Sequence, residues 1–292
     1  MNATTQARTQ ARPIDHLVLP TASLATARAR LSALGFTVAP DGIHPFGTAN
    51  CCVYLADGTF LEPLAVADTV VAAAAAGQGN VFVTRDASFR SRNGNEGFSA
   101  VVFATDDADS DHTAFVEAGV SAGDMLEFSR DFVDATGRKD RATFRLAFAA
   151  DNRVPDMFFF TCARIGVPNV DRSALQRHAN GVSRLKRVVI SDAIGAVEIA
   201  RQAAFATPPD ERGTVTTPNA AIEMWGGERL TGTFATLAPD DARLMAVVFG
   251  VADLATTSAA LAATGVAFEH RDDRIVVQPA PGQGATFAFE AA

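Results

Sequence analysis

The sequence has few cysteines: its 292 residues contain only three, Cys51, Cys52 and Cys162. An odd number, with two of them adjacent in an apolar run, does not fit a disulfide framework and indicates reduced, buried thiols. Adjacent residues of a strand point to opposite faces, so Cys51 and Cys52 cannot easily serve one site. The cysteines therefore favour a cytoplasmic protein.

Long apolar runs and clustered positive charge are also absent. No apolar run approaches the roughly 20 residues that a membrane helix requires. The net charge is −8, lysine occurs only at Lys139 and Lys186, and no basic stripe carries interleaved aromatic residues. Such a chain repels phosphate backbones. We therefore expect a globular protein that binds neither membranes nor nucleic acid.

Several familiar catalytic motifs are missing. Gly77-Gln78-Gly79 lacks the strand-to-helix setting of a dinucleotide-binding loop, and no Gly-Lys-Ser/Thr phosphate loop occurs. The Gly-x-Ser-x-Gly elbow of many hydrolases is absent as well. These absences disfavour a nucleotide enzyme and a serine hydrolase.

One supersecondary pattern is present four times. Each copy has an apolar strand, a short polar turn usually holding an aspartate, and an Ala-rich helix. The opening strands are Leu17–Leu19, Val101–Phe103, Val188–Ile190 and Val247–Phe249. Only the first copy has a histidine just before these apolar residues: its strand opens at Ile14, and His16 is the third residue. This asymmetry makes the first copy the best candidate for a site.

The spacing of apolar residues predicts that each copy is a βαβββ unit. In the first copy we expect a helix over residues 22–34 and strands over 36–39, 51–56 and 59–66. In the second we expect a helix over 111–118 and strands over 121–128, 142–149 and 157–161. The third and fourth copies, about 185–225 and 244–290, are shorter.

Such units expose an apolar sheet face and need a partner, so the economical assembly is two units per barrel. We therefore predict an α+β fold in which repeated βαβββ units form two open, cupped, mixed-sheet barrels. The expected organisation is a disordered tail over 1–13, an N-terminal barrel over 14–165, a linker over 166–181 and a C-terminal barrel over 182–292.

Particular motifs in these units resemble a known family. They are the opening Asp15-His16-Leu17-Val18-Leu19, the loop His44-Pro45-x-Gly47-Thr48-x-Asn50, the strand end Phe60-Leu61-Glu62, and the later segments Asp156-Met157-Phe158-Phe159-Phe160 and His178-Ala179-Asn180-Gly181. The chain resembles the glyoxalase-like group of the vicinal oxygen chelate superfamily over about residues 14–190. The resemblance implies paired βαβββ units and, in the enzymes, a divalent metal ion in the cup that chelates neighbouring oxygens of a substrate.

The family's metal ligands come from the first and fourth strands of each unit, and two residues match these positions in the first unit. His16 matches the first-strand ligand and Glu62 the fourth-strand ligand, which would make Glu62 a catalytic residue too. Imidazole and carboxylate suit Zn²⁺, Mn²⁺, Fe²⁺ or Ni²⁺. Each residue also has a purely structural explanation. His16 would be hydrogen-bonded to a backbone carbonyl, and Glu62 would be a rim carboxylate paired with an arginine.

The other three units depart from the family's ligand pattern. The second unit has Ala100 and the Phe158-Phe159-Phe160 run, which cannot bind a metal. The third has Arg187 and Glu223, and the fourth has Ala246 and Glu290. A third ligand would have to come from a loop, with His178 the first choice and His44 the second. This departure puts the metal itself in doubt.

Five further residues are candidates for binding a substrate. They are His44, Asn50, Arg90, Arg130 and Phe159. Arginines bind carboxylates through two hydrogen bonds, so Arg90, in a loop before the second unit, and Arg130, at a strand end, could hold an anion. The phenylalanine run would supply an apolar wall, although consecutive strand residues alternate and at most two can face inward. The alternatives are turn geometry for His44 and Asn50 and a solvated loop for the arginines.

Two functions therefore stay open. The first is a metal-dependent glyoxalase-like lyase, isomerase or ring-cleaving dioxygenase that acts on a small oxygenated molecule. The second is a metal-free, resistance-type protein that binds and sequesters a small aromatic or antibiotic-like compound, as some members of the superfamily do. The expected partner is a small molecule, anionic or aromatic, with a homodimer left open as the assembly.

Overall fold

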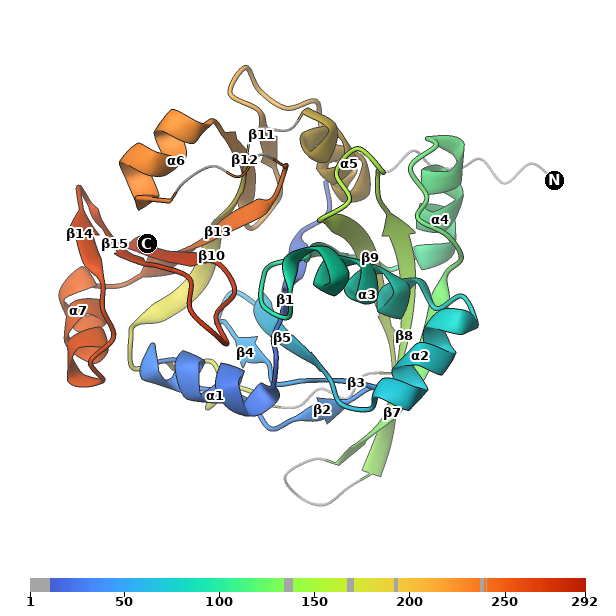
Figure 1. Ribbon diagram of the computed structural model, residues 1–292, viewed down its shortest axis with the longest axis horizontal. Coiled ribbons are helices and arrows are strands. Elements are labelled where there is room, and N and C mark those ends of the chain that lie inside the picture. The colour runs from blue at the N-terminus through green and yellow to red at the C-terminus, as the bar shows by residue number, and fades with distance from the viewer. Residues whose placement is uncertain (1–10, 134–138, 167–170, 192–193, 237–238, 240) are drawn as a thin grey trace.

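The computed structural model describes residues 11–133, 139–166, 171–191, 194–236, 239 and 241–292. These residues form two mixed β-sheets with helices on their faces, one sheet from each half of the chain (Figure 1). The predicted α+β class with cupped, mixed sheets is confirmed. Every helix in the described residues is too short or too polar to span a bilayer.

The first sheet has the strand order β2-β3-β5-β1-β6-β9-β8-β7, with β4 paired to β5. Strands β1 and β6 are antiparallel at its centre, while β1 runs parallel to β5 and β6 runs parallel to β9. Two βαβββ-like units thus lie side by side. The elements are β1 (Ile14–Pro20), α1 (Leu24–Ala33), β2 (Gly42–Ile43), β3 (Thr48–Asn50), β4 (Val53–Tyr54), β5 (Phe60–Val66), β6 (Ala100–Ala104), α4 (Ala108–Glu117), β7 (Leu126–Val133), β8 (Lys139–Ala149) and β9 (Phe158–Ile165).

The second sheet repeats this plan with the order β11-β12-β10-β13-β16-β15-β14. Strands β10 and β13 are antiparallel at its centre, and each has a parallel neighbour, β12 and β16 respectively. The elements are β10 (Val182–Ser191), α5 (Ile194–Ala204), β11 (Thr214–Thr216), β12 (Ala221–Trp225), β13 (Leu244–Val251), α7 (Leu254–Ala263), β14 (Glu269–Arg271), β15 (Arg274–Val277) and β16 (Thr286–Ala291).

The structure differs from the expected elements in several places, and the strand expected over 51–56 is limited to β4 (Val53–Tyr54). Residues 36–39 are not a strand, since Pro40 has no N–H to donate and the Thr37 N–H donates to His178 instead. Strand β7 begins only at Leu126, after Gly123 takes a positive φ of 131°. The segment that holds Arg90 is part of helix α3 and not a loop.

An inserted helical segment covers the concave face of each sheet. Helices α2 (Thr69–Gly77) and α3 (Val81–Asn93) follow β5, and helix α6 (Gly227–Phe234) follows β12. Side chains of the α2–α3 pair, such as Phe82, pack with Val18 and Phe160 of the first sheet. Leu230 and Phe234 of α6 pack in the same way on the second. We call these two covered concave faces the first cup and the second cup.

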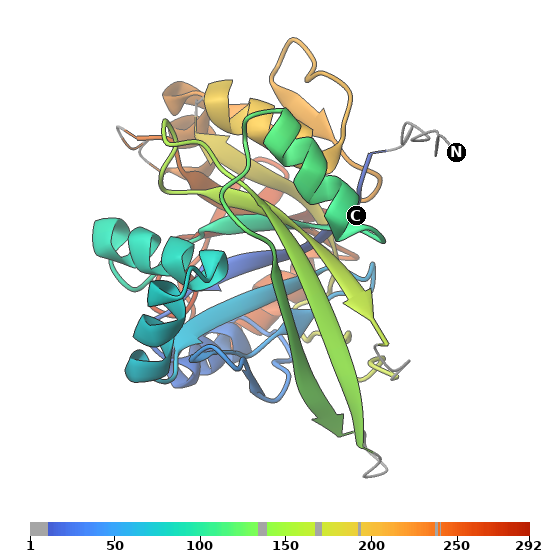
Figure 2. The ribbon, with the colours of Figure 1, turned by 90° about the vertical axis from the view of Figure 1, so that its right-hand side faces the viewer.

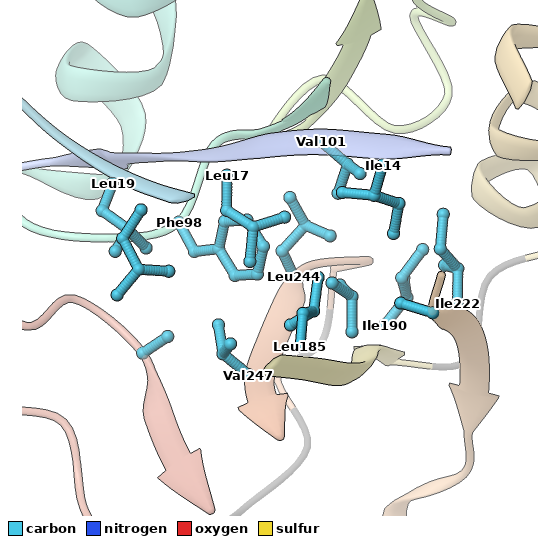
Figure 3. Close-up of a cluster of buried hydrophobic side chains, with 14 of the residues drawn as sticks. Ile14, Leu17, Leu19, Phe98, Val101, Leu185, Ile190, Ile222, Leu244 and Val247 are labelled. Atoms are coloured by element: carbon cyan, nitrogen blue, oxygen red, sulfur yellow. The ribbon is translucent and has the colours of Figure 1, made fainter. Parts of the chain in front are cut away.

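The convex faces of the two sheets pack against each other in one apolar core. Leu17 and Val101 of the first sheet and Leu185 and Val247 of the second belong to it, and each is 1% exposed or less. Figure 3 shows the side chains of β1 directed toward those of β10 and β13. Burial of this size supplies the main driving force for folding, so each sheet depends on the other for its stability.

Two segments outside the sheets hold the halves together. Of the predicted tail, residues 1–10 lie outside the described part, whereas Arg12 is 4% exposed, pairs with Asp111 and lies over Phe205 of the second half. Of the predicted linker, residues 167–170 also lie outside it. Asn180 packs on the first half, where its amide donates to the carbonyl of Leu34 at 2.8 Å. The long strands β7 and β8 extend away from the rest of the molecule (Figure 2).

Candidate active site

His16 and Glu62 meet on the concave face of the first sheet. Strand β1 runs parallel to β5, with His16 opposite Phe60 and Val18 opposite Glu62. Both polar side chains are buried, and His16 Nε2 lies 3.3 Å from Glu62 Oε2. The two residues that match the family's ligand positions are therefore in hydrogen-bonding contact.

The other nitrogen of His16 contacts the preceding residue. His16 Nδ1 lies 2.7 Å from Asp15 Oδ2, which also accepts a hydrogen bond from Arg164 Nη2 at 2.5 Å. A register shift between Ile14 and His16 marks a bulge in β1, and a bulge redirects side chains. The ring of Phe60 stacks on the imidazole with centroids 4.5 Å apart. These contacts fix the orientation of His16.

Asn50 and His44 complete the polar cluster. Asn50 Nδ2 donates to Glu62 Oε1 at 2.6 Å and lies 3.3 Å from His44 Nε2. Since Asn50 is the donor there, Nε2 of His44 accepts and its Nδ1 donates to Thr48 Oγ1 at 2.8 Å. His44 Nε2 lies 3.7 Å from Glu62 Oε1. We call His16, Glu62, Asn50 and His44 the polar cluster.

Burial and charge act on the three titratable groups differently. Burial raises the pKa of Glu62, but the hydrogen bond and charge of His16, then His44 and Asn50, lower it to about 2. Burial lowers the pKa of His16, yet hydrogen bonds to Asp15 and Glu62 raise it overall. Burial lowers the pKa of His44 to about 4, assisted by Arg130 and His16 and opposed by Glu62. At neutral pH we expect a carboxylate at Glu62 and a neutral His44, with the charged form of His16 favoured.

The symmetry-related positions in the second unit carry no metal-binding group. Ala100 occupies the place of His16 and Phe160 that of Glu62, because Val18 pairs with Ala100 and Val102 pairs with Phe160. The edge of Phe160 faces the His16 ring, with centroids 5.7 Å apart. This half of the first cup therefore presents an apolar wall to the polar cluster.

The polar cluster has suitable donor types for a metal ion but not a suitable arrangement. In the part of the chain that the structure describes, no group of three or more His, Cys, Asp or Glu side chains is placed to hold a metal. The Asn50 amide, a hydrogen-bond donor, lies between His44 and Glu62, and hydrogen bonds already occupy both carboxylate oxygens. As arranged, these residues do not fit a divalent cation.

Arg130 lies beside the polar cluster. The strand β7 that carries it is at the opposite edge of the sheet from β2, and the barrel nearly closes where they meet. A Cβ at Gly42 would lie 2.5 Å from Arg130 Nη1 and 2.6 Å from Asn50 Oδ1. The guanidinium lies 5.3 Å from the centroid of the Phe144 ring, and no carboxylate in the described residues pairs with it. It is thus a cation close to Asn50, and within the part of the chain that the structure describes it forms no ion pair.

Two of the predicted substrate-binding residues, Arg90 and Phe159, lie away from the polar cluster. The guanidinium of Arg90 is used inside the fold, where it bonds Asp86 and the carbonyls of Thr21, Leu64 and Asn95. Phe159 faces the core between the sheets, where its ring lies 6.5 Å from that of Phe103.

His178 is committed elsewhere, so it does not supply the predicted third ligand. Its Nδ1 accepts from the backbone N–H of Thr37 at 3.0 Å, and its Nε2 lies 3.0 Å from the carbonyl of Tyr54. Neither ring nitrogen faces Glu62. The segment that carries His178 is held at β4, where Gln176 also donates to the carbonyl of Leu55 at 3.2 Å.

The sequence-based prediction missed residues that support the site. Asp15 orients His16, and Arg164 holds Asp15 from the far end of β9. An aspartate directly before the candidate histidine was a usable signal, because histidines in sites are commonly held by a carboxylate on their second nitrogen. Arg164 gave no such signal, since it is distant in sequence and lies near the predicted linker.

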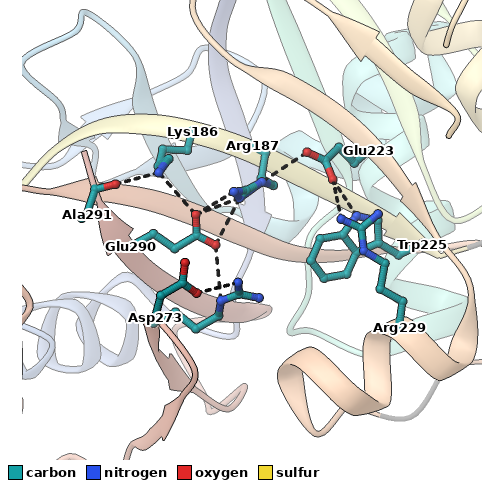
Figure 4. Close-up of polar contacts among 9 residues, drawn as sticks. Lys186, Arg187, Glu223, Trp225, Arg229, Asp273, Glu290 and Ala291 are labelled. Carbon is teal, nitrogen blue, oxygen red and sulfur yellow. Dashed lines mark hydrogen bonds and ion pairs between the residues drawn. The ribbon is translucent and has the colours of Figure 1, made fainter.

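The second cup has an ion-pair network at the corresponding place (Figure 4). Arg187 replaces His16 on the first strand, and its guanidinium bonds Glu290 through Nη1 at 2.9 Å and Nη2 at 2.6 Å. Its Nε lies 3.3 Å from Glu223, the residue that replaces Glu62. Glu223 also accepts from Trp225 Nε1 at 2.7 Å. The network thus consists of residues paired with one another.

The fold and the polar cluster together define a class, a glyoxalase-like protein with two cupped sheets. A family model for the glyoxalase-like domain matches residues 14–203, which is more than half of the chain. The chain therefore belongs to the glyoxalase-like domain family. The resemblance to the vicinal oxygen chelate superfamily is confirmed.

Solved structures with a similar fold were found. A hypothetical protein from Staphylococcus aureus is 13% identical, with a TM-score of 0.63, and the match covers 96% of this chain and 99% of that one. A mutant of 4-hydroxymandelate synthase from Streptomyces coelicolor is 14% identical, with a TM-score of 0.58 and coverage of 97% and 94%. A Mn(II)-bound glyoxalase from Novosphingobium aromaticivorans is 11% identical, with a TM-score of 0.47 and coverage of 96% and 82%. No curated protein matches this chain.

Proposed function

We propose that the first cup is the active site of a glyoxalase-like enzyme that moves a proton on a small, anionic, oxygenated molecule. The observation that carries this proposal is the buried contact between His16 and Glu62, which sets an acid beside a base. A paired imidazolium and carboxylate can donate one proton and accept another at the same place. The substrate class that fits is an organic acid with a carbonyl next to an acidic C–H bond.

Arg130 is the proposed binding group for the substrate's carboxylate. It is a cation beside Asn50, and no carboxylate in the described residues neutralises it. A guanidinium binds a carboxylate through two parallel hydrogen bonds, which would orient the neighbouring carbonyl toward the polar cluster. The ring of Phe160 and the methyl of Ala100 would bound the other side and exclude water.

Glu62 is the proposed base and His16 the proposed acid. When the substrate's carbonyl oxygen takes the hydrogen bond of His16 Nε2, Glu62 loses the contact that lowers its pKa most. The carboxylate then becomes a stronger base. Glu62 takes the proton from carbon, the electron pair of the broken C–H bond forms a C=C bond to the carbonyl carbon, the π pair of the carbonyl moves onto its oxygen, and His16 donates a proton to that oxygen to give the enol. Asp15 holds the ring in place throughout.

A metal-dependent alternative has one observation in its favour. In both histidines Nδ1 contacts a fixed partner, Asp15 or Thr48, so that Nε2 faces Glu62. Metal-ligating histidines are commonly held in this way. A divalent cation such as Zn²⁺, Mn²⁺, Fe²⁺ or Ni²⁺ would require the Asn50 amide to move. This alternative predicts that His16→Ala and Glu62→Gln each weaken metal binding in a calorimetric titration.

Proton transfer can be tested without knowing the natural substrate. Phenylpyruvate has a carboxylate, a neighbouring carbonyl and an acidic C–H bond, so its exchange of hydrogen for deuterium in D₂O reports proton abstraction by NMR. We expect the protein to accelerate this exchange above the spontaneous rate. Glu62→Gln should remove about 100-fold or more of the acceleration, since general-base catalysis contributes that much. Arg130→Leu should raise the half-saturating concentration.

The matched control is Glu223→Gln, which changes the corresponding carboxylate in the second cup and should leave the exchange unchanged. If wild type does not accelerate exchange, with or without added Zn²⁺, Mn²⁺, Fe²⁺ or Ni²⁺, the proton-transfer proposal is wrong. Tight binding of phenylpyruvate without exchange would instead support the protein that binds and sequesters a small molecule. Exchange that appears only with a metal would support the metal-dependent alternative.

A further inference from the structure

An apolar groove of about 610 Å³ lies on the surface beside the first cup. Its walls come from the loop before β3, from helix α2 and the start of α3, and from the start of β7. The lining is mostly apolar, with residues such as Phe46, Val71 and Ala74, and it also includes Gln78, Asn80 and Asp124. Val70 and Val71 are 77% and 40% exposed, which is unusual for large apolar side chains. The volume is within the usual range for small-molecule pockets.

Phe46 lies between this groove and the polar cluster, and Phe128 of β7 packs beside it, 5.6 Å from the His44 ring and 5.1 Å from that of Phe46. Phe46 lines the groove, is 6% exposed, and stacks on His44 with ring centroids 5.0 Å apart. Phe82 also contacts the His44 ring, at 6.1 Å, but it lies inside the cup and does not line the groove. The ring of Phe46 thus contacts the buried His44 on one side and lines the groove on the other.

The turn that carries Phe46 is fastened to the start of α2. The N–H groups of Ala67 and Asp68 donate to the carbonyl of Gly47 at 2.9 and 3.0 Å. Gly47 has a φ of +85°, and a Cβ there would lie 2.5 Å from the backbone nitrogen of Ala72. Because the turn and α2 touch so closely, a shift of the α2–α3 pair would carry Phe46 with it.

We propose that this groove binds the apolar part of the cup's substrate and that Phe46 closes the path between them. The inference rests on the proposed function, because it takes the polar cluster to be the place where the substrate reacts. Three observations carry it: the polar cluster is buried, the groove reaches the same turn that holds His44, and its walls are mostly apolar. The ligand is therefore an organic acid whose apolar group stays in the groove while its polar end enters the cup.

Access to His44 can be measured chemically, whatever the reaction. Diethyl pyrocarbonate modifies neutral imidazole, and mass spectrometry gives the rate at His44. Phe46→Ala should speed this modification about tenfold or more, because access no longer waits for a local opening. Phe82→Ala removes another aromatic ring beside His44, at 6.1 Å and inside the cup, and should not speed it comparably.

A second pair of variants leaves the core intact. Ala74 and Ala73 are neighbouring exposed residues of α2, and only Ala74 lines the groove. Ala74→Trp should fill the groove and slow the modification of His44, whereas Ala73→Trp should leave it at the wild-type rate. The inference is overturned if both tryptophans act alike, or if a folded Phe46→Ala protein reacts no faster than wild type.

Ligand binding tests the apolar part of the inference separately. Phenylpyruvate should bind about tenfold or more tightly than pyruvate, because burying a phenyl ring is strongly favourable. Ala74→Trp should remove this preference and Ala73→Trp should keep it. Equal binding of the two acids to wild type would overturn the groove assignment. If phenylpyruvate binds more tightly than pyruvate but no isotope exchange occurs, the assignment of the groove is supported and the proposed reaction is wrong.

Discussion

The two cups have the same strand plan but different polar groups at the same place. In each, a first strand lies between a parallel and an antiparallel neighbour, and an inserted helix covers the concave face. The first cup has His16 on its first strand and Glu62 on the parallel neighbour. The second has Arg187 and Glu223 at those positions, with Glu290 added from β16. The same strand arrangement thus holds a histidine–carboxylate pair in the first cup and an arginine–carboxylate network in the second.

The two cups differ in whether their polar groups change charge near neutral pH and in whether an arginine is already paired with carboxylates. A guanidinium does not lose its proton at ordinary pH, so the network in the second cup stays charged and can only hold strands together. Imidazole changes charge near neutral pH, so the first cup can take up and release protons. In the first cup Arg130 also has no carboxylate partner among the described residues. Chemistry is therefore expected in the first cup and stability in the second.

The largest expected effect comes from making the first cup like the second. His16→Arg should lower the acceleration of phenylpyruvate exchange by roughly 100-fold or more, because arginine cannot act as a proton donor at neutral pH. Circular dichroism should show an unchanged fold. The reciprocal change, Arg187→His, should leave exchange at the wild-type rate. Retained exchange in His16→Arg would mean that His16 does not move a proton.

The next effect is on stability in the second cup. Arg187→Leu should lower the free energy of unfolding by about 3 kcal/mol, because it leaves the 5% exposed Glu290 with weaker partners. Urea denaturation measures the change. The double variant Arg187→Leu, Glu290→Leu should recover most of the loss. If the single variant is as stable as wild type, the network does not stabilise the second cup.

A loss of stability of comparable size is expected from the first cup when the pH is lowered. The pKa of His44 falls from 6.5 to about 4 on folding, so between these values the unfolded chain binds the proton that the folded chain does not. Stability therefore falls as pH drops through this window, by on the order of 3 kcal/mol from His44 alone. Glu62, Arg130 and His16 face the ring, and Thr48 and Asn50 bond it.

His44→Gln should flatten this acid slope, measured by urea denaturation at pH 7 and pH 4.5. The comparison uses the difference between the two pH values within each protein, because the variant also changes stability overall. An unchanged slope would show that His44 is not held neutral in the folded protein.

The smallest effect is expected at the rim of the second cup. Arg229 stacks over Trp225 at 3.9 Å and pairs with Glu223 at 3.2 Å, but its side chain is 48% exposed. Arg229→Ala should cost about 0.5 to 1 kcal/mol, as exposed ion pairs and cation–π contacts do. Differential scanning calorimetry would measure the shift in Tm. A loss as large as that of Arg187→Leu would contradict the division between the buried network and its rim.

Local patterns predicted the repeat well. Apolar strands followed by Ala-rich helices marked the four openings that became β1, β6, β10 and β13. The alternation of a strand also allowed His16 and Glu62 to share a face once the repeat was aligned. It did not choose among three successive phenylalanines, since register decides whether Phe159 or Phe160 faces the cup. The helix containing Arg90 was missed because its amphipathic pattern is weak.

The amino-acid sequence by itself determined the βαβββ units, because strand alternation, helix spacing and turn residues are local properties. It also determined that one unit alone carries a histidine and a carboxylate at the family's ligand positions. Only the tertiary structure decided what surrounds them. Arg164 bonds Asp15 from 149 positions away in the sequence, and Arg187 bonds Glu290 from 103 positions away. Such partners are chosen by sheet order and packing, which bring distant segments together and which no local pattern specifies.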